Sequence, residues 1–373
     1  MPDGSVYDSK ELLALLRDGA SPFAWDGTCS SARSRRTLLQ GLHIKQSNGQ
    51  DIMARLARND VNMPEFDGFP IEWQASEAQF EAAVYELLRP EAEILASRLL
   101  YHRFPAQHPG TKLETPQDLA GRRLFLFETA EGENNVWWDL SSEQKAHLLT
   151  QAAHIRASLF TFTPPSDFTS TWLRERLFEQ KPELFPIPVA PIHEFCLALF
   201  TSKIEATIKN IGDMIGWEDD NETVGSVAFA AKLLALEHGD FGIHNMSITM
   251  NRTKPRITSL YDWETGCIVP AILSDPLMAV DVDLISDENA ALLFSRVADD
   301  ASEEAKAEYM ACAKQYFKVL FEEAPDYEHV IQMGKDLRHI WFALRDWRGE
   351  DPEGYLRALG AWAEDRLKEL AVE

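Results

Sequence analysis

Residues 237–245 read Glu-His-Gly-Asp-Phe-Gly-Ile-His-Asn and carry the clearest chemical pattern of the chain. Asp240 and Asn245 lie five residues apart in this stretch, which we expect to form a loop ahead of a strand. Phosphoryl transfer needs a carboxylate that orients an attacking hydroxyl and accepts its proton, and it needs oxygen ligands for divalent cations. Asp240 and Asn245 provide one group of each kind.

A second polar segment follows shortly afterwards. Residues 247–261 predict two short strands joined by a polar turn, and residues 261–264 read Tyr-Asp-Trp-Glu. Because a hairpin brings the loop before its first strand near the end of its second strand, we expect Asp262 to join Asp240 and Asn245. Mg²⁺ prefers hard oxygen ligands and takes only one or two carboxylates from a protein. Asn245 and Asp262 are therefore the predicted metal ligands.

The order of these residues resembles that of a known family. In the kinase catalytic template an Asp is the base, an Asn follows it closely, and a strand-borne Asp completes the metal site. Residues 238–241 and 261–264, with Asn245 between them and Pro270 after them, closely resemble the HGD…N…DWE signature of aminoglycoside phosphotransferase and choline kinase-like proteins, particularly fungal ones. The resemblance extends over about residues 19–276.

This resemblance implies roles for individual residues. It makes Asp240 the catalytic base, Asn245 and Asp262 the Mg²⁺ ligands, and His238 a support for the loop. It also implies a kinase-like two-lobed fold, with ATP and Mg²⁺ as cofactors and a small molecule with a hydroxyl group as the acceptor. A polypeptide acceptor is disfavoured, because no DFG sequence and no APE-bounded activation segment follows the Asp-Trp-Glu motif.

A basic residue on the second strand of the nucleotide lobe is expected to contact the phosphates. Kinases usually have a lysine there, whereas this chain offers Arg55, with Arg58 as the second candidate. A guanidinium can bind phosphate through two hydrogen bonds, but its reach differs from that of an ammonium group. Glu81 on the following predicted helix is expected to pair with this arginine, and Glu77 is the alternative.

The remaining nucleotide contacts are assigned by order along the chain. Glu128 and Ala130 follow a predicted buried strand and fall where the adenine hinge of the family would lie. Residues 26–31 are the candidate for the loop that covers the phosphates. This segment has one glycine where kinases have several, although its small Ser and Thr residues permit close approach of a phosphate.

The succession of predicted elements indicates an α+β fold. We expect a small antiparallel-sheet, nucleotide-binding lobe with one helix in residues 1–130, and a larger, mainly helical catalytic and substrate lobe in residues 131–373. The first lobe should contain a lead-in helix over 9–16, strands over 38–46, 51–58 and 123–128, a loop over 59–74, and a helix that begins at a capping box of Ser76 and Gln79. The second should contain a helix capped by Ser141 and Gln144 and further helices across 192–211, 224–236, 303–322 and 328–370.

Composition limits the classes of protein that fit. The 373 residues are 45% hydrophobic and 26% charged, which is ordinary for a globular protein and long for a single core. A formal net charge of -24 disfavours nucleic acid and anionic membranes as partners. Four widely spaced cysteines suit a reducing compartment, and no basic stretch with an apolar core opens the chain, so we expect a cytoplasmic protein.

Other interpretations of the motif remain open. His238, Asp240, His244 and Asp262 could together hold a hydrolytic metal ion, although the two histidines lack the helical or hairpin spacing of most such sites. Asp240 could instead cap a turn, and Asp262 could be a surface residue without a chemical role. His244 could be a loop histidine that takes no part in the chemistry.

A catalytically silent protein is the main alternative in function. The glycine-poor segment and the missing strand lysine favour a nucleotide-binding or scaffold protein of kinase-like fold. The presence of Asp240, Asn245 and Asp262 favours the enzyme, because a scaffold has no physical need for a base together with two metal ligands.

Overall fold

The computed structural model describes residues 27–31, 39–46, 49, 51–57, 71–104, 123–176, 194, 198, 234–251, 254–346 and 352–370. The chain divides into two compact units. The first unit is Met1–Ile155 with His238–Gly266, and the second is Arg156–Glu237 with Cys267–Glu373. The α+β class is confirmed in the described residues, and the lobe boundary expected near residue 130 stays a prediction.

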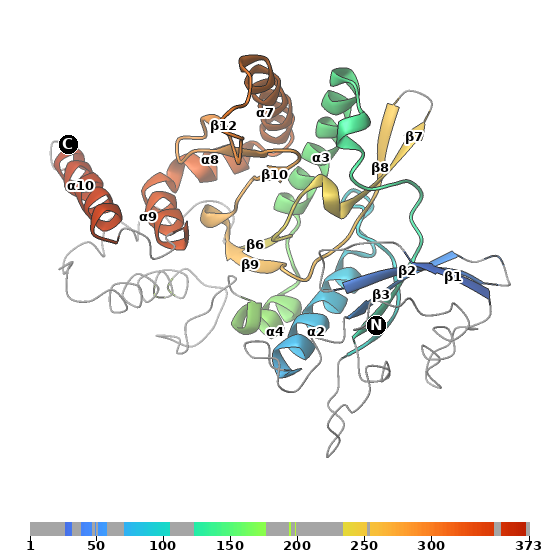
Figure 1. Ribbon diagram of the computed structural model, residues 1–373. Helices are drawn as coiled ribbons and strands as arrows, with labels where there is room; N and C mark the ends of the chain where they lie inside the picture. Colours follow the sequence, from blue (N-terminus) through green and yellow to red (C-terminus); the bar gives the residue numbers. More distant parts are fainter. Residues whose placement is uncertain are drawn as a thin grey trace. The chain divides into compact units, whose positions relative to one another are not determined.

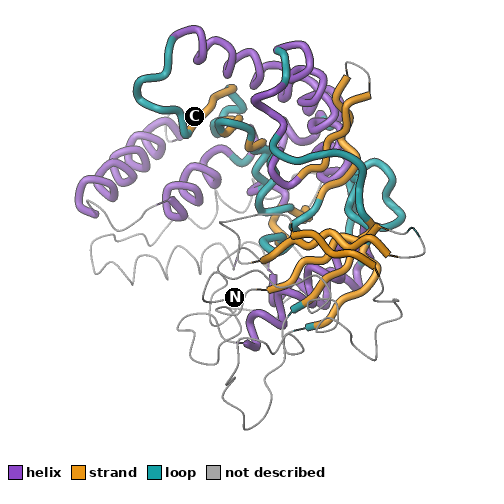
Figure 2. The backbone as a smooth tube through the Cα atoms, turned by 45° about the vertical axis from the view of Figure 1, so that its right-hand side comes forward, coloured by secondary structure: helices purple, strands orange, loops and turns teal. Residues whose placement is uncertain are grey.

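An antiparallel sheet in the order β1-β2-β3-β5-β4 forms the centre of the first unit (Figures 1 and 2). Its strands are β1 (Gly27–Ser31), β2 (Leu39–Gln46), β3 (Asp51–Ala57), β4 (Leu99–Arg103) and β5 (Leu124–Glu128). The predicted hairpin is confirmed, since β2 pairs with β3 from Leu39↔Ala57 to Lys45↔Asp51. Gly49 in its turn has a φ of 86°, a conformation that glycine adopts without steric strain.

The segment expected to cover the phosphates is a strand instead of a loop. Residues 27–31 form β1 and pair antiparallel with β2 along its length. The single glycine is therefore at the start of a strand, where the backbone is engaged with a neighbour. The prediction of a loop is therefore wrong for residues 27–31, and their contact with phosphates stays a prediction.

Helix α2 (Ile71–Leu88) packs in the first unit and contacts β4. It begins five residues before the expected capping box, so Ser76 and Gln79 lie within the helix and do not cap it. Pro70 directly precedes the helix in the sequence, and proline is well tolerated around a helix start. Phe80, Val84 and Leu88 are buried on one face, and Glu81 and Tyr85 are buried beside them.

Helix α3 (Ser142–Thr161) begins at a capping box that the sequence predicted correctly. The Ser141 N–H donates to Gln144 Oε1 at 2.8 Å, and the Gln144 N–H donates to Ser141 Oγ at 3.3 Å. The predicted hairpin after the catalytic motif is also confirmed, as β7 (Met246–Asn251) paired with β8 (Lys254–Leu260). Gln151 of α3 fixes this hairpin, because its side chain bonds the backbone of Pro255 and Ile257.

The second unit contains short strands and most of the described C-terminal helices (Figure 1). Strand β6 (Leu234–Glu237) pairs with β9 (Cys267–Pro270), and β10 (Met278–Ala279), β11 (Asp283–Ser286) and β12 (Leu292–Ser295) form a small sheet. The helices are α4 (Ser166–Arg176), α7 (Glu303–Glu323), α8 (Pro325–Met333), α9 (Lys335–Asp346) and α10 (Pro352–Leu370).

The helices expected in this region have mixed outcomes. The helix over 303–322 is confirmed by α7, and the region 328–370 is divided among α8, α9 and α10. The helix expected over 224–236 is wrong at its end, because Leu234–Glu237 is strand β6 and pairs with β9. A short buried apolar run fits both element types, and only the pairing decides between them. The helix over 9–16 and nearly all of 192–211 lie outside the described residues.

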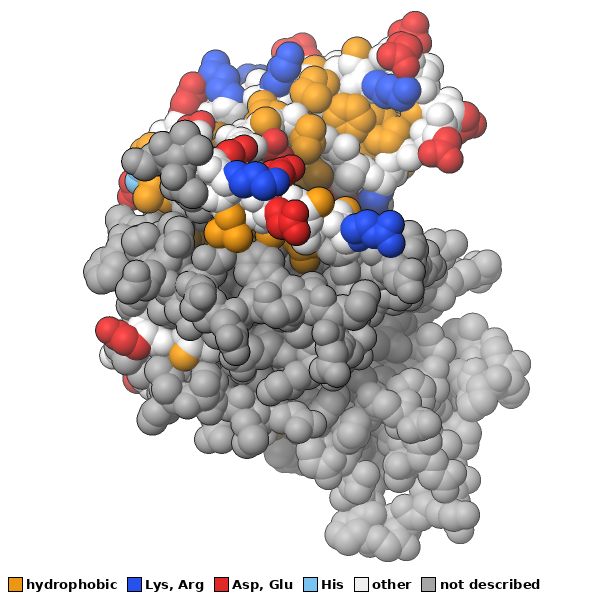
Figure 3. All heavy atoms as spheres, turned by 90° about the vertical axis from the view of Figure 1, so that its left-hand side faces the viewer, with side chains coloured by type: hydrophobic (Ala, Val, Ile, Leu, Met, Phe, Trp, Pro, Cys, Tyr) orange, Lys and Arg blue, Asp and Glu red, His pale blue; other side chains and the backbone are white. Residues whose placement is uncertain are grey.

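Acidic, basic and apolar side chains are interspersed on the described portion of the face in Figure 3. No described helix combines the length and apolar character needed to cross a bilayer.

Candidate active site

The loop between β6 and β7 holds Asp240 in a defined orientation. Its Oδ2 atom accepts hydrogen bonds from His244 Nε2 at 2.8 Å and from Asn245 Nδ2 at 3.1 Å. Asn245 Nδ2 also donates to the Asp240 carbonyl at 2.9 Å, which closes the loop onto the short 3₁₀ helix Ile243–Asn245. The Asp240 side chain is 51% exposed, so its carboxylate is both held and open to solvent.

These contacts keep the Asp240 carboxylate charged. The hydrogen bond from His244 lowers the pKa of Asp240, and the positive charge of a protonated His244 and the amide of Asn245 act in the same direction. A partly exposed, ionised carboxylate is the form that can accept a proton. His244, which the sequence left as a possible loop histidine without chemistry, therefore contacts the candidate base directly.

Gly239 is required by the backbone of this loop. Its φ is 82°, and a Cβ atom built at this position would lie 2.1 Å from the carbonyl oxygen of Thr265. That separation is far inside van der Waals contact with a backbone atom that cannot rotate away. The glycine of the His-Gly-Asp motif thus permits the close approach that places Asp240.

His238 supports the loop from the interior. It is fully buried, and its ring lies 4.5 Å from the Trp263 ring. Its Nε2 lies 3.0 Å from the Tyr261 carbonyl oxygen, and its Nδ1 accepts a long hydrogen bond of 3.4 Å from the Asp240 N–H. These partners favour the tautomer with the proton on Nε2, which donates to Tyr261. His238 therefore ties the loop of Asp240 to the end of β8.

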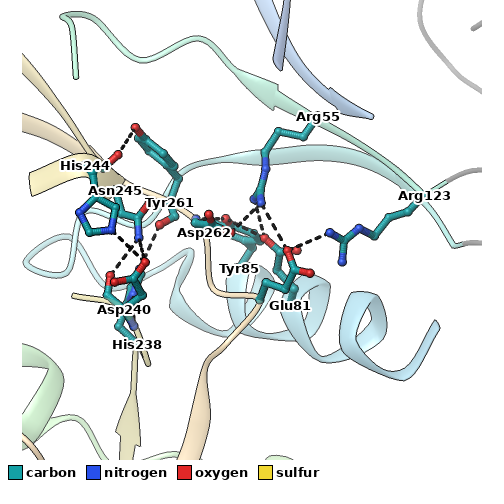
Figure 4. A network of polar contacts seen from close by, with 11 residues as sticks. Arg55, Glu81, Tyr85, Arg123, His238, Asp240, His244, Asn245, Tyr261 and Asp262 are labelled. Atoms are coloured by element: carbon teal, nitrogen blue, oxygen red, sulfur yellow. Dashed lines mark hydrogen bonds and ion pairs between the residues drawn. The ribbon is translucent and has the colours of Figure 1, made fainter. Parts of the chain in front are cut away.

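Tyr261 makes two further links between the loop and β8 (Figure 4). Its N–H donates to the Asn245 carbonyl at 3.0 Å, and its hydroxyl donates to the His244 carbonyl at 2.8 Å. Asn134 Nδ2 donates to the same hydroxyl at 3.2 Å. Asp262, the next residue, is consequently held at the end of a strand that is bonded to the loop carrying the other two predicted residues.

A second polar group surrounds Asp262, and we call Arg55, Glu81, Tyr85, Arg123, Asp262 and Glu264 the site cluster. Figure 4 labels all of these residues except Glu264. Arg55 Nη1 lies 2.7 Å from Glu81 Oε1, and Arg55 Nη2 lies 2.6 Å from Asp262 Oδ1. The pairing of Arg55 with Glu81 that the sequence suggested is present. Arg55 additionally contacts the predicted metal ligand, which the sequence did not suggest.

The protonation states in the site cluster follow from burial and proximity. Burial raises the pKa of Glu81 and outweighs the opposite effect of Arg55. Burial by itself lowers the pKa of Arg55, but the nearby carboxylates of Glu81 and Asp262 more than offset this effect and raise it. Arg55 is therefore a permanent cation that connects a buried carboxylate to a partly exposed one.

Sequence reasoning missed three residues of the site cluster. Tyr85 bonds both Glu81 and Asp262, and Arg123 Nη2 lies 2.8 Å from Glu264 Oε2. Glu264 also lies 3.9 Å from Arg55 Nη2. A signal existed for Tyr85, which lies one turn after Glu81 on the same helix face, and for Glu264, which belongs to the Asp-Trp-Glu motif. Arg123 gave none, because a single basic residue beside an apolar run has no distinctive pattern.

The structure does not bring every predicted residue together. Glu128 ends β5, and its side chain pairs at 3.1 Å with Arg98 on the surface. Ala130 follows in the next loop and is half-buried. Neither side chain takes part in the described contacts of the site cluster, so their place at an adenine hinge stays a prediction. Arg58 lies outside the described residues.

The donor atoms near the motif suit Mg²⁺ better than a hydrolytic metal ion held by histidines. The described residues contain no group of three or more His, Cys, Asp or Glu side chains that could hold a metal ion. Both nitrogens of His238 face protein partners. Asn245 donates through Nδ2, which leaves Oδ1 as its ligating atom, and Asp262 offers Oδ2 beside the Oδ1 bound to Arg55. One amide and one carboxylate oxygen fit the modest protein ligand set of Mg²⁺.

No protein-family model and no curated protein matches this chain. Solved structures that are similar to it include the streptomycin-ATP ternary complex of APH(2'')-IIa, with 12% identity, coverage of 91% of this chain and 90% of that one, and a TM-score of 0.43. Another is ADP-bound aminoglycoside phosphotransferase APH(2'')-Ib, with 12% identity, coverage of 90% and 92%, and a TM-score of 0.42. A third is the amicoumacin kinase hAmiN with AMP-PNP, Ca²⁺ and Ami, with 12% identity, coverage of 88% and 86%, and a TM-score of 0.38. These scores lie below 0.5, so the functional argument rests on the residues of the site.

Proposed function

We propose that this chain is an ATP- and Mg²⁺-dependent phosphotransferase of kinase-like two-lobed fold that acts on a hydroxyl group of a small molecule, as aminoglycoside phosphotransferases and choline kinases do. One observation carries the proposal. His238 and Tyr261 bond the loop of Asp240 and Asn245 to the end of the strand that leads into Asp262. Residues about 20 positions apart in sequence thereby form one polar group of the composition that phosphoryl transfer requires.

Asp240 is the proposed base. Its carboxylate is exposed enough to meet a substrate, and its hydrogen bonds to His244 and Asn245 fix its orientation and lower its pKa. In the reaction the acceptor hydroxyl gives its proton to Asp240 while its oxygen forms a bond to the terminal phosphorus of ATP. The bond between that phosphorus and the bridging oxygen breaks, and ADP leaves with the electron pair.

Asn245 and Asp262 are the proposed ligands of Mg²⁺. When bound there, Mg²⁺ would neutralise the negative charge of the phosphates. The residues of the chain prepare this site, because Asn245 is fixed by its bonds to Asp240 and Asp262 is fixed by Arg55. Arg55 is proposed to contact the phosphates from β3, with Glu81 holding its guanidinium in place.

A second function is favoured by a specific observation. Arg55 already neutralises Asp262 at 2.6 Å, and the segment expected to cover the phosphates is strand β1. A kinase-like protein in this state could bind nucleotide without transferring phosphate. The ionised and solvent-accessible Asp240 favours the enzyme, since binding alone needs no such base. Glu128 and Ala130 remain the proposed adenine contacts, and the proposed location is the cytoplasm.

The test compares Asp240→Asn with the wild type and with the surface variant Asp300→Asn. ATP consumption is measured with Mg²⁺ and a panel of choline, aminoglycosides and other amino-alcohols. We expect at least one acceptor to be phosphorylated, Asp300→Asn to keep full activity, and Asp240→Asn to lose about 10²- to 10⁴-fold in kcat/KM, the usual contribution of a general base.

Two results distinguish the alternatives. Thermal stabilisation by Mg²⁺ and ATP without transfer to any acceptor would support the nucleotide-binding protein. Transfer by Asp240→Asn at the wild-type rate would remove Asp240 from the chemistry and contradict the proposed mechanism.

A further inference from the structure

Tyr85 connects the helix of the first unit to the predicted metal ligand. It lies on α2 one turn after Glu81 and is only 2% exposed. Its hydroxyl oxygen accepts a hydrogen bond from the Asp262 N–H at 3.0 Å and donates its own proton to Glu81 Oε1 at 3.3 Å. One hydroxyl thus bonds the backbone of Asp262 and the side chain of Glu81.

The backbone of Asp262 needs such a contact. Its φ of 71° is in the left-handed region, which few residues other than glycine adopt. Aspartate tolerates this region better than most residues, but the conformation persists only where the surroundings hold it. Arg55 holds the carboxylate at 2.6 Å, and Tyr85 holds the N–H. The side chain and the backbone N–H of Asp262 are therefore held by two different elements, β3 and α2.

The hydroxyl of Tyr85 makes hydrogen bonds, whereas its ring makes only a packing contact. The ring packs edge-on against Phe127 at 4.9 Å between centroids, and phenylalanine would preserve that contact. The hydroxyl bonds Glu81 Oε1 and the Asp262 N–H, and phenylalanine would lose both contacts. Removal of the hydroxyl would leave the Asp262 N–H without this acceptor and free the backbone to leave the left-handed region.

We propose that Tyr85 is a positioning residue for the metal site, whose hydroxyl holds Asp262 in the orientation that binds Mg²⁺. The inference rests on the proposed function, because it takes Asp262 as the metal ligand. Because Tyr85 belongs to α2, the position of this helix would influence the affinity of Asp262 for the metal. The proposed contacts to the nucleotide base are made by other residues, Glu128 and Ala130. Loss of the hydroxyl should therefore weaken metal binding selectively.

The experiment compares Tyr85→Phe with Tyr316→Phe. Tyr316 is also a fully buried tyrosine, but its hydroxyl has no hydrogen-bond partner among the described residues, so its removal controls for the loss of a buried hydroxyl as such. The full-length chain is titrated with Mg²⁺ at saturating ATP and with Mn²⁺ alone, and ATP binding is measured separately in the presence of EDTA.

We expect Tyr85→Phe to raise the apparent Kd for Mg²⁺ and Mn²⁺ about 5- to 10-fold, the effect of losing one well-placed hydrogen bond. ATP binding in EDTA should change by less than about twofold, and Tyr316→Phe should change neither quantity. A purely structural role of Tyr85 predicts a lower melting temperature with unchanged metal affinity. Phe127→Leu provides that comparison, because it disturbs the packing of the ring and keeps the hydroxyl.

The outcomes separate the two proposals. Metal affinity of Tyr85→Phe equal to that of the wild type overturns the positioning role and leaves the proposed function intact. Absence of Mg²⁺-dependent nucleotide binding in the wild type overturns both. An equal loss of metal affinity in Tyr85→Phe and Phe127→Leu assigns the effect to packing and also overturns the positioning role.

Discussion

Each unit of the molecule contains a buried arginine bonded to a glutamate, and the two clusters differ in how far their carboxylates are exposed to solvent. In the second unit, Arg156 contacts the Glu237 carboxylate, the Asp275 carbonyl and, at 3.1 Å, the Tyr327 hydroxyl. Ser274 bonds the other carboxylate oxygen of Glu237. We call these five residues the sealed cluster. Its arginine and glutamate side chains are only 3% and 10% exposed.

The site cluster of the first unit is partly open to solvent. Its Glu81 side chain is fully buried and is held by Arg55 and Tyr85. Asp262 is 32% exposed, although Arg55 bonds one of its oxygens. A partly exposed carboxylate can exchange partners with water or a ligand, whereas the Arg156–Glu237 pair is enclosed. The exposure of Asp262 therefore suits a site that binds a ligand, and the enclosed pair suits a cluster that maintains the fold.

The largest effect expected from this comparison is on stability, in the sealed cluster. Arg156→Met leaves the Glu237 carboxylate buried without its cation, and breaking a buried pair in this way costs about 3–5 kcal/mol of unfolding free energy. Urea denaturation followed by circular dichroism measures the change. Lys318→Met, at an exposed position of α7, should stay within about 0.5 kcal/mol of the wild type. A loss below about 1 kcal/mol in Arg156→Met would show that the sealed cluster does not maintain the fold.

The next effect is on ligand response, in the site cluster. At ligand concentrations of about 100 times Kd, Mg²⁺ and ATP should stabilise the wild type by about 2.7 kcal/mol. Asp262→Asn should lose most of this stabilisation because an amide replaces a ligating carboxylate, while its stability without ligand changes little, since Arg55 keeps Glu81 as a partner. Thermal denaturation with and without Mg²⁺ and ATP measures both quantities. The comparison fails if Asp262→Asn unfolds as readily as Arg156→Met and still responds fully to the ligand.

The smallest effect concerns pH and a histidine outside both clusters. His102 in β4 is partly buried and lies beside Phe104, and this burial lowers the pKa of its ring. The negative charge of Glu86 raises the same pKa, but its effect is smaller. The folded state thus favours the neutral ring of His102. The stability that this histidine contributes is present above its unfolded pKa of about 6.5, and it is lost as the pH falls through the lower pKa of the folded state.

Denaturation curves at pH 7 and pH 5 test this sign. The wild type should lose more stability between the two values than His102→Gln, whose side chain does not titrate. Parallel losses in the two proteins would mean that the acid sensitivity of the first unit comes from other groups.

Local sequence patterns were sufficient for some elements and not for others. The capping box of Ser141 and Gln144 and the hairpin β7–β8 were predicted correctly, because each is set by residues within a few positions of one another. Ser76 matched the same capping pattern and failed, since α2 begins at Ile71. Residues 234–236 were predicted as the end of a helix and belong to strand β6, because the pairing of this strand with β9 outweighs local preference.

The contacts of the candidate site were likewise predictable from the sequence only in part. The motif predicted Asp240, Asn245 and Asp262 as site residues, and the following helix offered Glu81, with Glu77 as the alternative, as the partner of Arg55. The contact of Arg55 with Glu81 is present. The sequence did not predict that Tyr85 accepts a hydrogen bond from the Asp262 backbone, since residues 177 positions apart give no signal in one sequence. Nor did it separate the two arginine clusters, because the exposure of a side chain is set only when the surrounding atoms are in place.

The sequence alone determined which chemical groups this protein offers for the proposed reaction and their order along the chain, because a short loop and a hairpin constrain only nearby residues. The tertiary structure decided which carboxylates are buried, which arginine contacts the predicted metal ligand, and which hydroxyl holds its backbone. These properties depend on the removal of water and on contacts between distant elements, and neither exists until the chain has folded.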